Sequence, residues 1–462
     1  MTLIKSISGI RGTIGGSVGD NLTPVDVVKF AAAYGSWVKQ QRNKETYRVV
    51  VGRDARKSGE MIQKLVMHTL VGMGIHVVDL GLSTTPTVEI AVALEQADGG
   101  IILTASHNPK QWNALKLLNN KGEFLDASEG EKILKIVENE NFLFSEVDNL
   151  GKISKNDAYI DIHIDEVLDL PLVNVEAIKK ANFKVVVDAV NSTGGIAIPL
   201  LLNRLGVQTI KLYCTPNGEF PHNPEPLKEH LGDISRLVVK EKADLGIVVD
   251  PDVDRLALVC EDGEMFGEEY TLVACADYVL SKSNGNTVSN LSSSRALRDV
   301  TEKHGGKYRA SAVGEVNVVQ LMKDTKAIIG GEGNGGIIYP ESHYGRDSLV
   351  GVALFLSLLA EKQMKVSTLR TMYPNYFMSK KKIELTPYLN VDALLDKIKE
   401  RYKDEEITTI DGVKIDFPTH WVHLRKSNTE PIIRIYTEAK TQEEADALAE
   451  RFIKEIREIA QM

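Results

Sequence analysis

A serine ends an apolar run in the segment ILTASHNPKQWNALK, residues 102–116, and His107 follows it directly. The run GGIILTA at residues 99–105 is typical of a strand, and α/β proteins place their ligands at the carboxyl ends of strands. The sequence therefore predicts that Ser106 lies at an exposed strand end, where it could react.

Two chemistries were compared for Ser106. A triad hydrolase would need a nucleophile of the G-x-S-x-G type, but Ala105 and His107 flank this serine, so acyl transfer is not expected. A phosphorylated serine is the alternative, since a phosphate adds a charge of about −1.5 to −2 and needs a cation and hydrogen-bond donors nearby. Taken alone, the letters ASHNP also fit an ordinary turn.

Three carboxylates alternate in the segment DPDVDR, residues 250–255, between two strand-like runs. Alternate residues in a tight bend can converge on one hard cation, and a divalent ion offsets the repulsion between like charges. The segment therefore predicts a site, most simply for magnesium, formed by Asp250, Asp252 and Asp254. The alternative is an acidic turn in solvent.

An EF-hand is a further alternative for the acidic segment, with Glu261 as its terminal ligand. It would make the chain a calcium-binding module rather than an enzyme. However, Arg255 stands where the calcium loop needs glycine, and the following residues LALV read as a strand. The calcium interpretation also leaves Ser106 unexplained.

A glycine-rich segment, IGGEGNGGIIYP at residues 329–340, formally contains the G-x-G-x-x-G spacing of a dinucleotide-binding oxidoreductase. The context argues against it, because residues that end in Pro340 cannot open the required helix. We interpret the segment as a close-fitting loop whose Glu332 and Asn334 bind a polyhydroxy ligand. A simple flexible turn is the alternative.

The segment RKSNTEPIIR, residues 425–434, places many hydrogen-bond donors in one loop before a strand. This composition suits a phosphate group. The candidate donors are Arg425, Ser427, Asn428, Thr429 and Arg434. A polar surface hairpin is the alternative.

The elements that must position these residues alternate between strand and helix patterns. Strands are expected at 47–52, 183–188 and 245–250, and a helix at 25–41. Such alternation indicates an α/β fold with mixed or parallel sheets. Residues 47–59 and 183–195 resemble each other, and 287–300 is a looser copy, which favours three similar α/β domains.

A smaller C-terminal domain is expected beyond the segment SKKKIELTP, residues 379–387. It ends in an amphipathic helix at 441–462, for which Thr441 and Glu444 form a capping box. A chain of 462 residues is in any case too long for one core, since single cores stop growing at roughly 250–300 residues.

Composition narrows the class of protein. A net charge of −9 without a long basic run argues against nucleic acid or a membrane surface as the main partner. The three cysteines, Cys214, Cys260 and Cys275, lack metal-ligand spacing and do not suggest a disulfide scaffold, which fits a cytoplasmic protein. No signal peptide or membrane span is expected.

Together and in this order, the four segments resemble the α-D-phosphohexomutase family. Three further segments match its pattern: SGIRG at 8–12, GRDARKSG at 52–59 and PNGEFPHNPEP at 216–226. The resemblance spans essentially the whole chain. It implies an enzyme that moves phosphate between the 1- and 6-positions of a hexose.

The resemblance also implies an architecture. Three related α/β mixed-sheet domains and a smaller C-terminal α+β domain would surround a central cleft. The expected domains are 1–150 with the phosphoserine loop, 151–255 with the metal loop, 256–372 with the sugar loop and 373–462 with the phosphate loop. The chain would be a monomer or a homodimer.

The resemblance implies roles for the candidate residues. Ser106 would carry the phosphate and, with Asp250, Asp252 and Asp254, hold one Mg²⁺ per chain. Lys116 would transfer a proton, its ammonium made more acidic by cationic and metal charge around it. Hexose 1,6-bisphosphate would be the intermediate and activator. The full catalytic set would be Ser106, Lys116, Arg11, His107 and Arg255.

Two positions depart from the family pattern. Members with an SGH ending in the sugar loop have a histidine where Gly336 stands, and the usual NG before the lysine is Asn113-Ala114 here. A histidine-assisted mechanism at that loop is therefore not predicted. The GEGNGG form resembles phosphoglucosamine mutases, with broad phosphoglucomutase/phosphomannomutase enzymes as the alternative.

Overall fold

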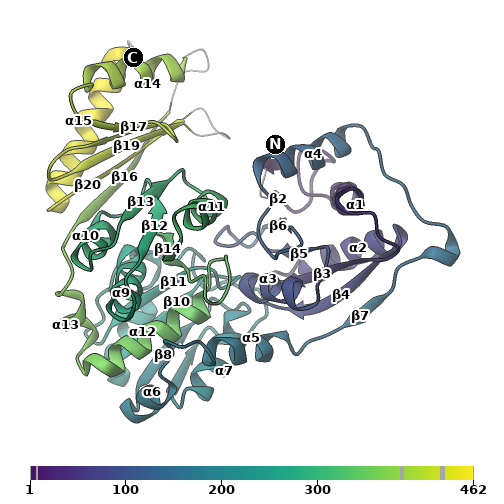
Figure 1. Cartoon of the computed structure of the whole chain (residues 1–462), viewed down its shortest axis with the longest axis horizontal. Coiled ribbons are helices and arrows are strands. Elements are labelled where there is room, and N and C mark those ends of the chain that lie inside the picture. Colours follow the sequence, from purple (N-terminus) through teal and green to yellow (C-terminus); the bar gives the residue numbers. More distant parts are fainter. Residues whose placement is uncertain (1, 7–8, 385–389, 427–431, 461–462) are drawn as a thin grey trace. The chain divides into compact units, whose positions relative to one another are not determined.

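The computed structural model describes residues 2–6, 9–384, 390–426 and 432–460. The chain divides into two compact units, residues 1–278 with 334–369 and residues 279–333 with 370–462. Figure 1 labels most of the elements along the chain. No helix in the described ranges is long and apolar enough to cross a membrane.

The first sheet of unit 1 is mixed and has the strand order β1-β2-β6-β5-β3-β4-β7. The central strands β3, β4, β5 and β7 pair in parallel, whereas β1, β2 and β6 add antiparallel pairs. In this order the strands are Ile4–Ser6, Gly9–Thr13, Trp112–Leu118, Gly99–Leu103, Tyr47–Arg53, Ile75–Leu82 and Ile153–Lys155. The predicted strand at 47–52 is thus β3.

Helices cover both faces of this sheet. The valines of β3 alternate between two cores, because successive side chains of a strand point to opposite faces. Val49 and Val51 lie in one core with Trp37 of α1 (Pro24–Gln41), and Val50 lies in the other with Val88 of α3 (Thr85–Leu94). Helices α2 (Gly59–Gly72) and α4 (Ala127–Glu138) contribute to the first core. The predicted helix at 25–41 is thus α1.

The second sheet of unit 1 has the order β11-β10-β8-β9, formed by Leu256–Cys260, Leu245–Val249, Lys184–Asp188 and Gln208–Leu212. Only β10 and β11 are antiparallel. The accompanying elements are α5 (Tyr159–Leu168), α6 (Val175–Ala181), α7 (Gly194–Arg204), α8 (Gly232–Glu241) and the 3₁₀ turns Val147–Asn149 and Lys228–His230. Unit 1 also contains β15 (Gly336–Ile338) and α12 (Ser348–Lys362). The chain crosses between the units within α9 (Glu268–Lys282), between Gly333 and Asn334, and within α13 (Val366–Arg370).

Unit 2 begins with a parallel arrangement in which β12 (Asn286–Asn290) pairs with β13 (Tyr308–Ser311) and β14 (Ala327–Glu332). Helices α10 (Ala296–Lys303) and α11 (Glu315–Thr325) connect these strands. The strands β3, β8 and β12 therefore share one topology, since each pairs in parallel with the next strand and with a later one. This confirms the predicted relationship among the three α/β domains.

The rest of unit 2 is an antiparallel sheet with the order β16-β20-β19-β18-β17. Its strands are Phe377–Glu384, Ile432–Ala439, Trp421–Lys426, Val413–Asp416 and Glu406–Thr408. Helices α14 (Val391–Arg401) and α15 (Gln442–Ala460) pack on one face (Figure 1). Glu444 N–H donates to Thr441 Oγ1 at 3.2 Å, as a capping interaction at the start of α15 requires. The predicted α+β C-terminal domain is confirmed.

Candidate active site

Ser106 lies three residues beyond β5, and only 7% of it is exposed, less than the exposed strand end predicted from the sequence. Its Oγ donates a hydrogen bond to Asp250 Oδ2 at 2.7 Å. Its backbone has φ of 48°, in the left-handed region that costs an L-residue about 1–2 kcal/mol. Such local strain needs surrounding contacts to hold it.

Those contacts come from the loop after β3. Thr104 Oγ1 accepts the Ser106 N–H at 2.9 Å and donates to Asp54 Oδ2 at 2.7 Å. The fully buried Arg56 pairs with Asp54 at 3.0 Å. Its guanidinium also donates to four carbonyl oxygens of the serine loop, those of Ser106, Asn108, Pro109 and Trp112. Arg56 therefore fixes the backbone on both sides of His107.

Arg56 is one residue of the segment 52–59, and no role was predicted for it from the sequence. The sequence feature that could have pointed to Arg56 is its pairing with Asp54, because two opposite charges stand one residue apart after a strand that reads as buried. Nothing in the sequence shows that their partners are backbone carbonyls about 50 residues further along the chain, so this role emerged only from the structure.

We expect Arg56→Met to lower the free energy of unfolding by about 3–5 kcal/mol, because the carboxylate of Asp54 would stay buried without its cation. Urea unfolding followed by tryptophan fluorescence, to which Trp37 in the same domain core contributes, measures the change. Lys57→Met is the matched control, since Lys57 is an exposed neighbour and should leave stability unchanged. Equal stability of the two variants would contradict the assigned role.

Asp250, Asp252 and Asp254 are fully buried in the turn between β10 and β11, and their carboxylate atoms lie within 4.8 Å of one another. Val253 at the centre has φ of 66°, an unfavourable value for a β-branched residue. Asp250 Oδ1 holds the turn by accepting the N–H groups of Asp254 and Arg255, each at 3.1 Å.

The charge balance of this cluster fits a cation. Burial, with help from the neighbouring aspartates, raises the pKa of Asp250 well above its usual range. The buried atoms Asp252 Oδ1 and Asp254 Oδ1 have no hydrogen-bond partner within the described residues. Unpaired carboxylate oxygens in a dry site are costly, and oxygen-only ligands suit Mg²⁺ or Ca²⁺.

Lys116 lies on β6 against the same carboxylates. Its Nζ is 2.7 Å from Asp252 Oδ2 and 3.4 Å from Asp254 Oδ2. Burial opposes its charge, but the attraction of the two carboxylates outweighs it and raises the pKa of Lys116. In this arrangement the lysine partly neutralises the aspartates. The sequence expectation of a more acidic ammonium includes metal charge beside the lysine, and it stays a prediction.

Arg346 is a cation of the site that the sequence analysis did not identify. Its Nη2 donates to Asp254 Oδ2 at 2.8 Å. A Cβ atom at Gly336 would lie 2.3 Å from Arg346 Cδ, so the side chain of Arg346 occupies the space that a larger residue at 336 would need. The aliphatic part of the Arg346 side chain thus fills the space beside Gly336.

The remaining predicted residues of unit 1 lie around this centre. Burial first, and then the charge of Arg255, lower the pKa of His107 to about 2, so its ring is neutral. The Nδ1 atom of this ring is 3.3 Å from Ser106 Oγ.

The other residues of the site have polar or backbone partners of their own. Arg255 Nη1 is 3.4 Å from Glu225 Oε1. Arg11 lies on β2, opposite Ala114 in β6. Asn334 Oδ1 accepts the Gly336 N–H at 3.2 Å. Thr85, which no sequence pattern identified, donates to Asp252 Oδ2 at 2.6 Å.

Unit 2 holds the other predicted residues. Glu332 is buried, and its Oε1 accepts from Asn290 Nδ2 at 2.8 Å and from Gly314 N–H at 3.2 Å. Arg425 Nε is held by Asp411 at 2.8 Å. Arg425 is directly opposite Arg434, which is opposite Lys382 on the next strand. Ser427, Asn428 and Thr429 lie outside the described residues.

The cation row Lys382, Arg434 and Arg425 crosses three neighbouring strands. Like charges directly opposite each other destabilise a sheet, and an anion such as phosphate would relieve the repulsion. Asp411 offsets the charge of Arg425, so the row is compatible with an anion site, which stays a prediction.

Two alternative interpretations fail on the structure. Residues 336–338 form the strand β15 and not the helix that a dinucleotide fingerprint requires. Glu261 follows β11 and bonds to Ser367, so it does not close a calcium loop around the aspartates. Neither an oxidoreductase nor an EF-hand is supported.

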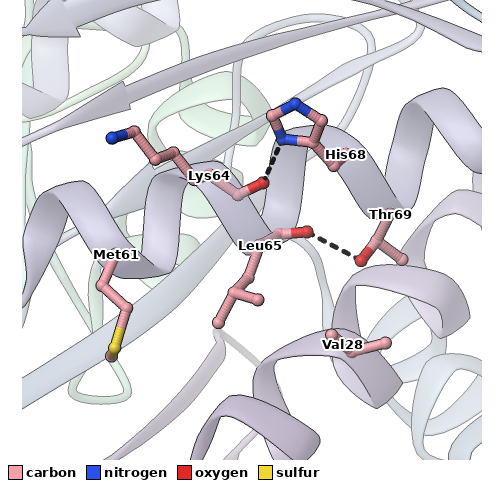
Figure 2. A pocket seen from close by; sticks show the side chains of 6 residues that line it. All are labelled: Val28, Met61, Lys64, Leu65, His68 and Thr69. Atoms are coloured by element: carbon pink, nitrogen blue, oxygen red, sulfur yellow. Dashed lines mark hydrogen bonds between the residues drawn. The ribbon is translucent and has the colours of Figure 1, made fainter.

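A hollow of about 540 Å³ lies between α1 and α2, away from Ser106 and the three aspartates (Figure 2). Its polar side chains serve their own helix, since His68 Nδ1 is 2.7 Å from Lys64 O and Thr69 Oγ1 donates to Leu65 O at 2.7 Å. The remaining lining is mostly apolar, so this hollow offers no catalytic groups.

Comparison with known proteins identifies the chain. The four consecutive domains of phosphoglucomutase/phosphomannomutase match it, the α/β/α domains I, II and III at residues 3–144, 161–263 and 267–376 and the C-terminal domain at 381–455. The chain is 35% identical to a phosphoglucomutase/phosphomannomutase of Thermococcus kodakarensis, with 97% of this chain and 98% of the relative covered.

Two further comparisons agree. The chain is 33% identical to a phosphoglucosamine/phosphogalactosamine mutase of Sulfurisphaera tokodaii, with 96% of this chain and 97% of the relative covered. A solved phosphoglucomutase/phosphomannomutase family structure from Burkholderia thailandensis superposes with a TM-score of 0.85 at 26% identity, covering 99% of this chain and 97% of that one. The chain therefore belongs to the phosphoglucomutase/phosphomannomutase family, the α-D-phosphohexomutases, and is an intramolecular phosphotransferase.

Proposed function

We propose that this phosphohexomutase interconverts hexose 6-phosphate and hexose 1-phosphate through phosphorylated Ser106 and a hexose 1,6-bisphosphate. The observation that carries the proposal is the position of Ser106 Oγ, 2.7 Å from Asp250 in a cluster of three buried carboxylates and one lysine. A serine in such a place can hold a phosphate only if a cation offsets the carboxylates.

The oxygen donors of Asp250, Asp252 and Asp254 fit Mg²⁺, and a phosphate oxygen on Ser106 would complete the set. When bound, the ion withdraws charge from the transferring phosphoryl group. Arg346 and Arg255 would hold the oxygens of that group, and Arg11 would assist them. Positioning and charge are what phosphoryl transfer requires of a protein.

The two transfers use the same groups in opposite directions. In the first, the bond between Ser106 Oγ and phosphorus breaks as a sugar hydroxyl oxygen bonds to phosphorus, and Lys116 exchanges the proton between the two oxygens. In the second, the reoriented bisphosphate returns its other phosphoryl group to Ser106. Neutral His107 would orient the serine oxygen, to which its Nδ1 is close.

The substrate contacts are proposed on the same basis. Glu332 and Asn334 would bind sugar hydroxyls, and Arg425, Arg434 and the loop 427–429 would bind the phosphate that is not reacting.

The domain boundaries after residues 150, 255 and 372 remain predictions. We also propose a cytoplasmic location, which the three free cysteines support.

We propose glucosamine phosphate as the preferred substrate. The Sulfurisphaera relative is named for amino sugars, and a buried carboxylate such as Glu332 would favour an ammonium group over a hydroxyl. Broad activity on glucose and mannose phosphates is the second candidate, supported by the name of the Thermococcus relative. Turnover of glucosamine, glucose and mannose 6-phosphates, measured side by side, decides between them.

Arg425→Ala is expected to reduce kcat/KM by about 10- to 100-fold, since a charge-assisted hydrogen bond contributes about 1.5–3 kcal/mol. The bisphosphate should also escape more often before it reorients, which leaves dephosphorylated enzyme. Turnover should therefore decline with time and recover when hexose bisphosphate is added. Rates are measured over many turnovers with and without that compound.

Lys454→Ala is the control, because this exposed residue of α15 lies in the same unit and outside the cation row. If Arg425→Ala keeps normal rates and affinity and no added dependence on bisphosphate, the loop does not bind the distal phosphate.

A further inference from the structure

Two histidines and an aspartate of unit 1 converge on one point with no role in the reaction above. Nε2 of His163, on α5, lies 2.8 Å from Asp347 Oδ2, and Nε2 of His343 lies 3.1 Å from the same oxygen. All three side-chain atoms lie within 4.8 Å of one another. His163 and Asp347 are fully buried, whereas the side chain of His343 is 13% exposed.

The second polar atom of each side chain is held by another group. Asp347 Oδ1 accepts the N–H groups of Leu349 and Val350 at the start of α12. His163 Nδ1 is 2.9 Å from Thr87 Oγ1, and His343 Nδ1 is 3.3 Å from Glu89 Oε2. Metal-binding histidines are commonly oriented in this way by a partner on the nitrogen that does not bind the ion.

The spacing fits an ion with little movement. Ligand atoms bound at about 2.0–2.2 Å to one tetrahedral Zn²⁺ lie roughly 3.3–3.6 Å apart. Each histidine Nε2 already lies 2.8 or 3.1 Å from Asp347 Oδ2, and the three ligand atoms all lie within 4.8 Å of one another. An ion therefore requires a shift of at most about 1.5 Å between any two of them. Two imidazoles and one carboxylate are ligands that suit zinc and its neighbours among the transition metals better than magnesium.

A hollow of about 120 Å³ lies beside the cluster, and Glu89 and His343 contribute to its lining. Glu123 and Glu166 also line it, against one lysine, Lys121, so this hollow is negatively charged and favours a cation. The backbone at Gly345 passes close to Glu89, the partner of His343, since a Cβ at residue 345 would lie 1.9 Å from Glu89 Oε2.

We propose that His163, His343 and Asp347 form a second metal site, for Zn²⁺ or a similar divalent transition-metal ion. Water from the side of His343, the partly exposed member of the cluster, would take a fourth position on the ion. The ion would link α5, which carries His163, to the segment 341–347, which carries His343 and Asp347. The contact between His343 and Glu89 would extend this link to α3. It would also fix the residue next to Arg346, which contacts Asp254.

The full-length protein, stripped of metal and then held in excess Mg²⁺, is titrated with Co²⁺. Four- or five-coordinate Co²⁺ with imidazole ligands absorbs visible light far more strongly than Co²⁺ bound by six oxygens, so the two sites are distinguishable. We expect one strongly absorbing Co²⁺ per chain. His343→Gln should weaken its binding by about 100-fold or more, and Thr87→Val, which removes only the orienting hydroxyl, by about 10-fold or more.

Two controls separate this site from the others. His68→Gln removes an exposed histidine of α2 and should bind Co²⁺ as the wild type does. Asp252→Asn should keep the absorption while it impairs the aspartate site, so failure of the mutase mechanism and failure of this proposal give different results. Zn²⁺ should raise the melting temperature of the wild type but not of His343→Gln.

The proposal is overturned if the wild type shows no strongly absorbing Co²⁺, or if His343→Gln binds it with unchanged affinity. Should His343→Gln fail to fold, the wild-type titration and Thr87→Val still decide the question. A wild type without this absorption would make the cluster a hydrogen-bonded network of the fold.

Discussion

Ser106→Ala should lower turnover by at least about a thousandfold, because the oxygen that accepts and returns the phosphoryl group is lost. The variant should fold, since alanine keeps the Cβ and the loop is held mainly by Arg56 and not by the serine hydroxyl. Intact-mass measurement gives a second readout. Wild-type protein should carry one phosphoryl group that is lost on incubation with hexose phosphate, and the variant should carry none.

Ser106→Gly sharpens this experiment. Glycine adopts the observed φ of 48° without steric cost, so this variant should be more stable than Ser106→Ala by about 1 kcal/mol. Both should be equally inactive, which separates the chemical role of the hydroxyl from the stability of the loop. Ser128→Ala, an exposed change on α4, controls for general effects. Near-normal turnover of Ser106→Ala would rule out the covalent mechanism.

Asp252→Asn should weaken Mg²⁺ binding and activity together, with a loss of at least about 100-fold in turnover at moderate Mg²⁺. The carboxamide keeps the shape of the side chain but removes one anionic ligand. Raising the Mg²⁺ concentration should restore part of the rate, since the other two aspartates remain. Activity measured as a function of Mg²⁺, alongside direct measurement of Mg²⁺ binding, tests both effects.

Asp262→Asn is the matched control, because Asp262 is exposed in the turn after β11 and accepts the N–H of Glu264. It should leave the Mg²⁺ dependence unchanged. Exhaustive chelation should also abolish wild-type activity and Mg²⁺ should restore it. Activity that survives chelation would contradict a metal role for the three aspartates.

Local patterns in the sequence predicted the positions of the main elements. The apolar β-branched runs became β3, β8 and β10, because a strand buried on both faces needs apolar residues at every position. The alternating aspartates were identified as one cluster since they lie within five residues, too short a segment to separate them. The similarity of 47–59 and 183–195 predicted the shared topology of the α/β domains.

Contacts between distant parts of the chain were not predictable in this way. Arg56 reaches the serine loop across 50 residues, Arg346 reaches Asp254 across 92, and His163 meets Asp347 across 184. The sequence likewise does not show that β6 brings Lys116 against Asp252 and Asp254.

The sequence by itself therefore determined the α/β class, the candidate phosphoserine and the acidic turn, all of which depend on residues close together along the chain. The tertiary structure alone decided which buried charges neutralise one another and which side chain fills the space beside Gly336. The physical reason is that a buried charge must find a partner within a few ångströms, and packing, not position in the sequence, decides which partner is there.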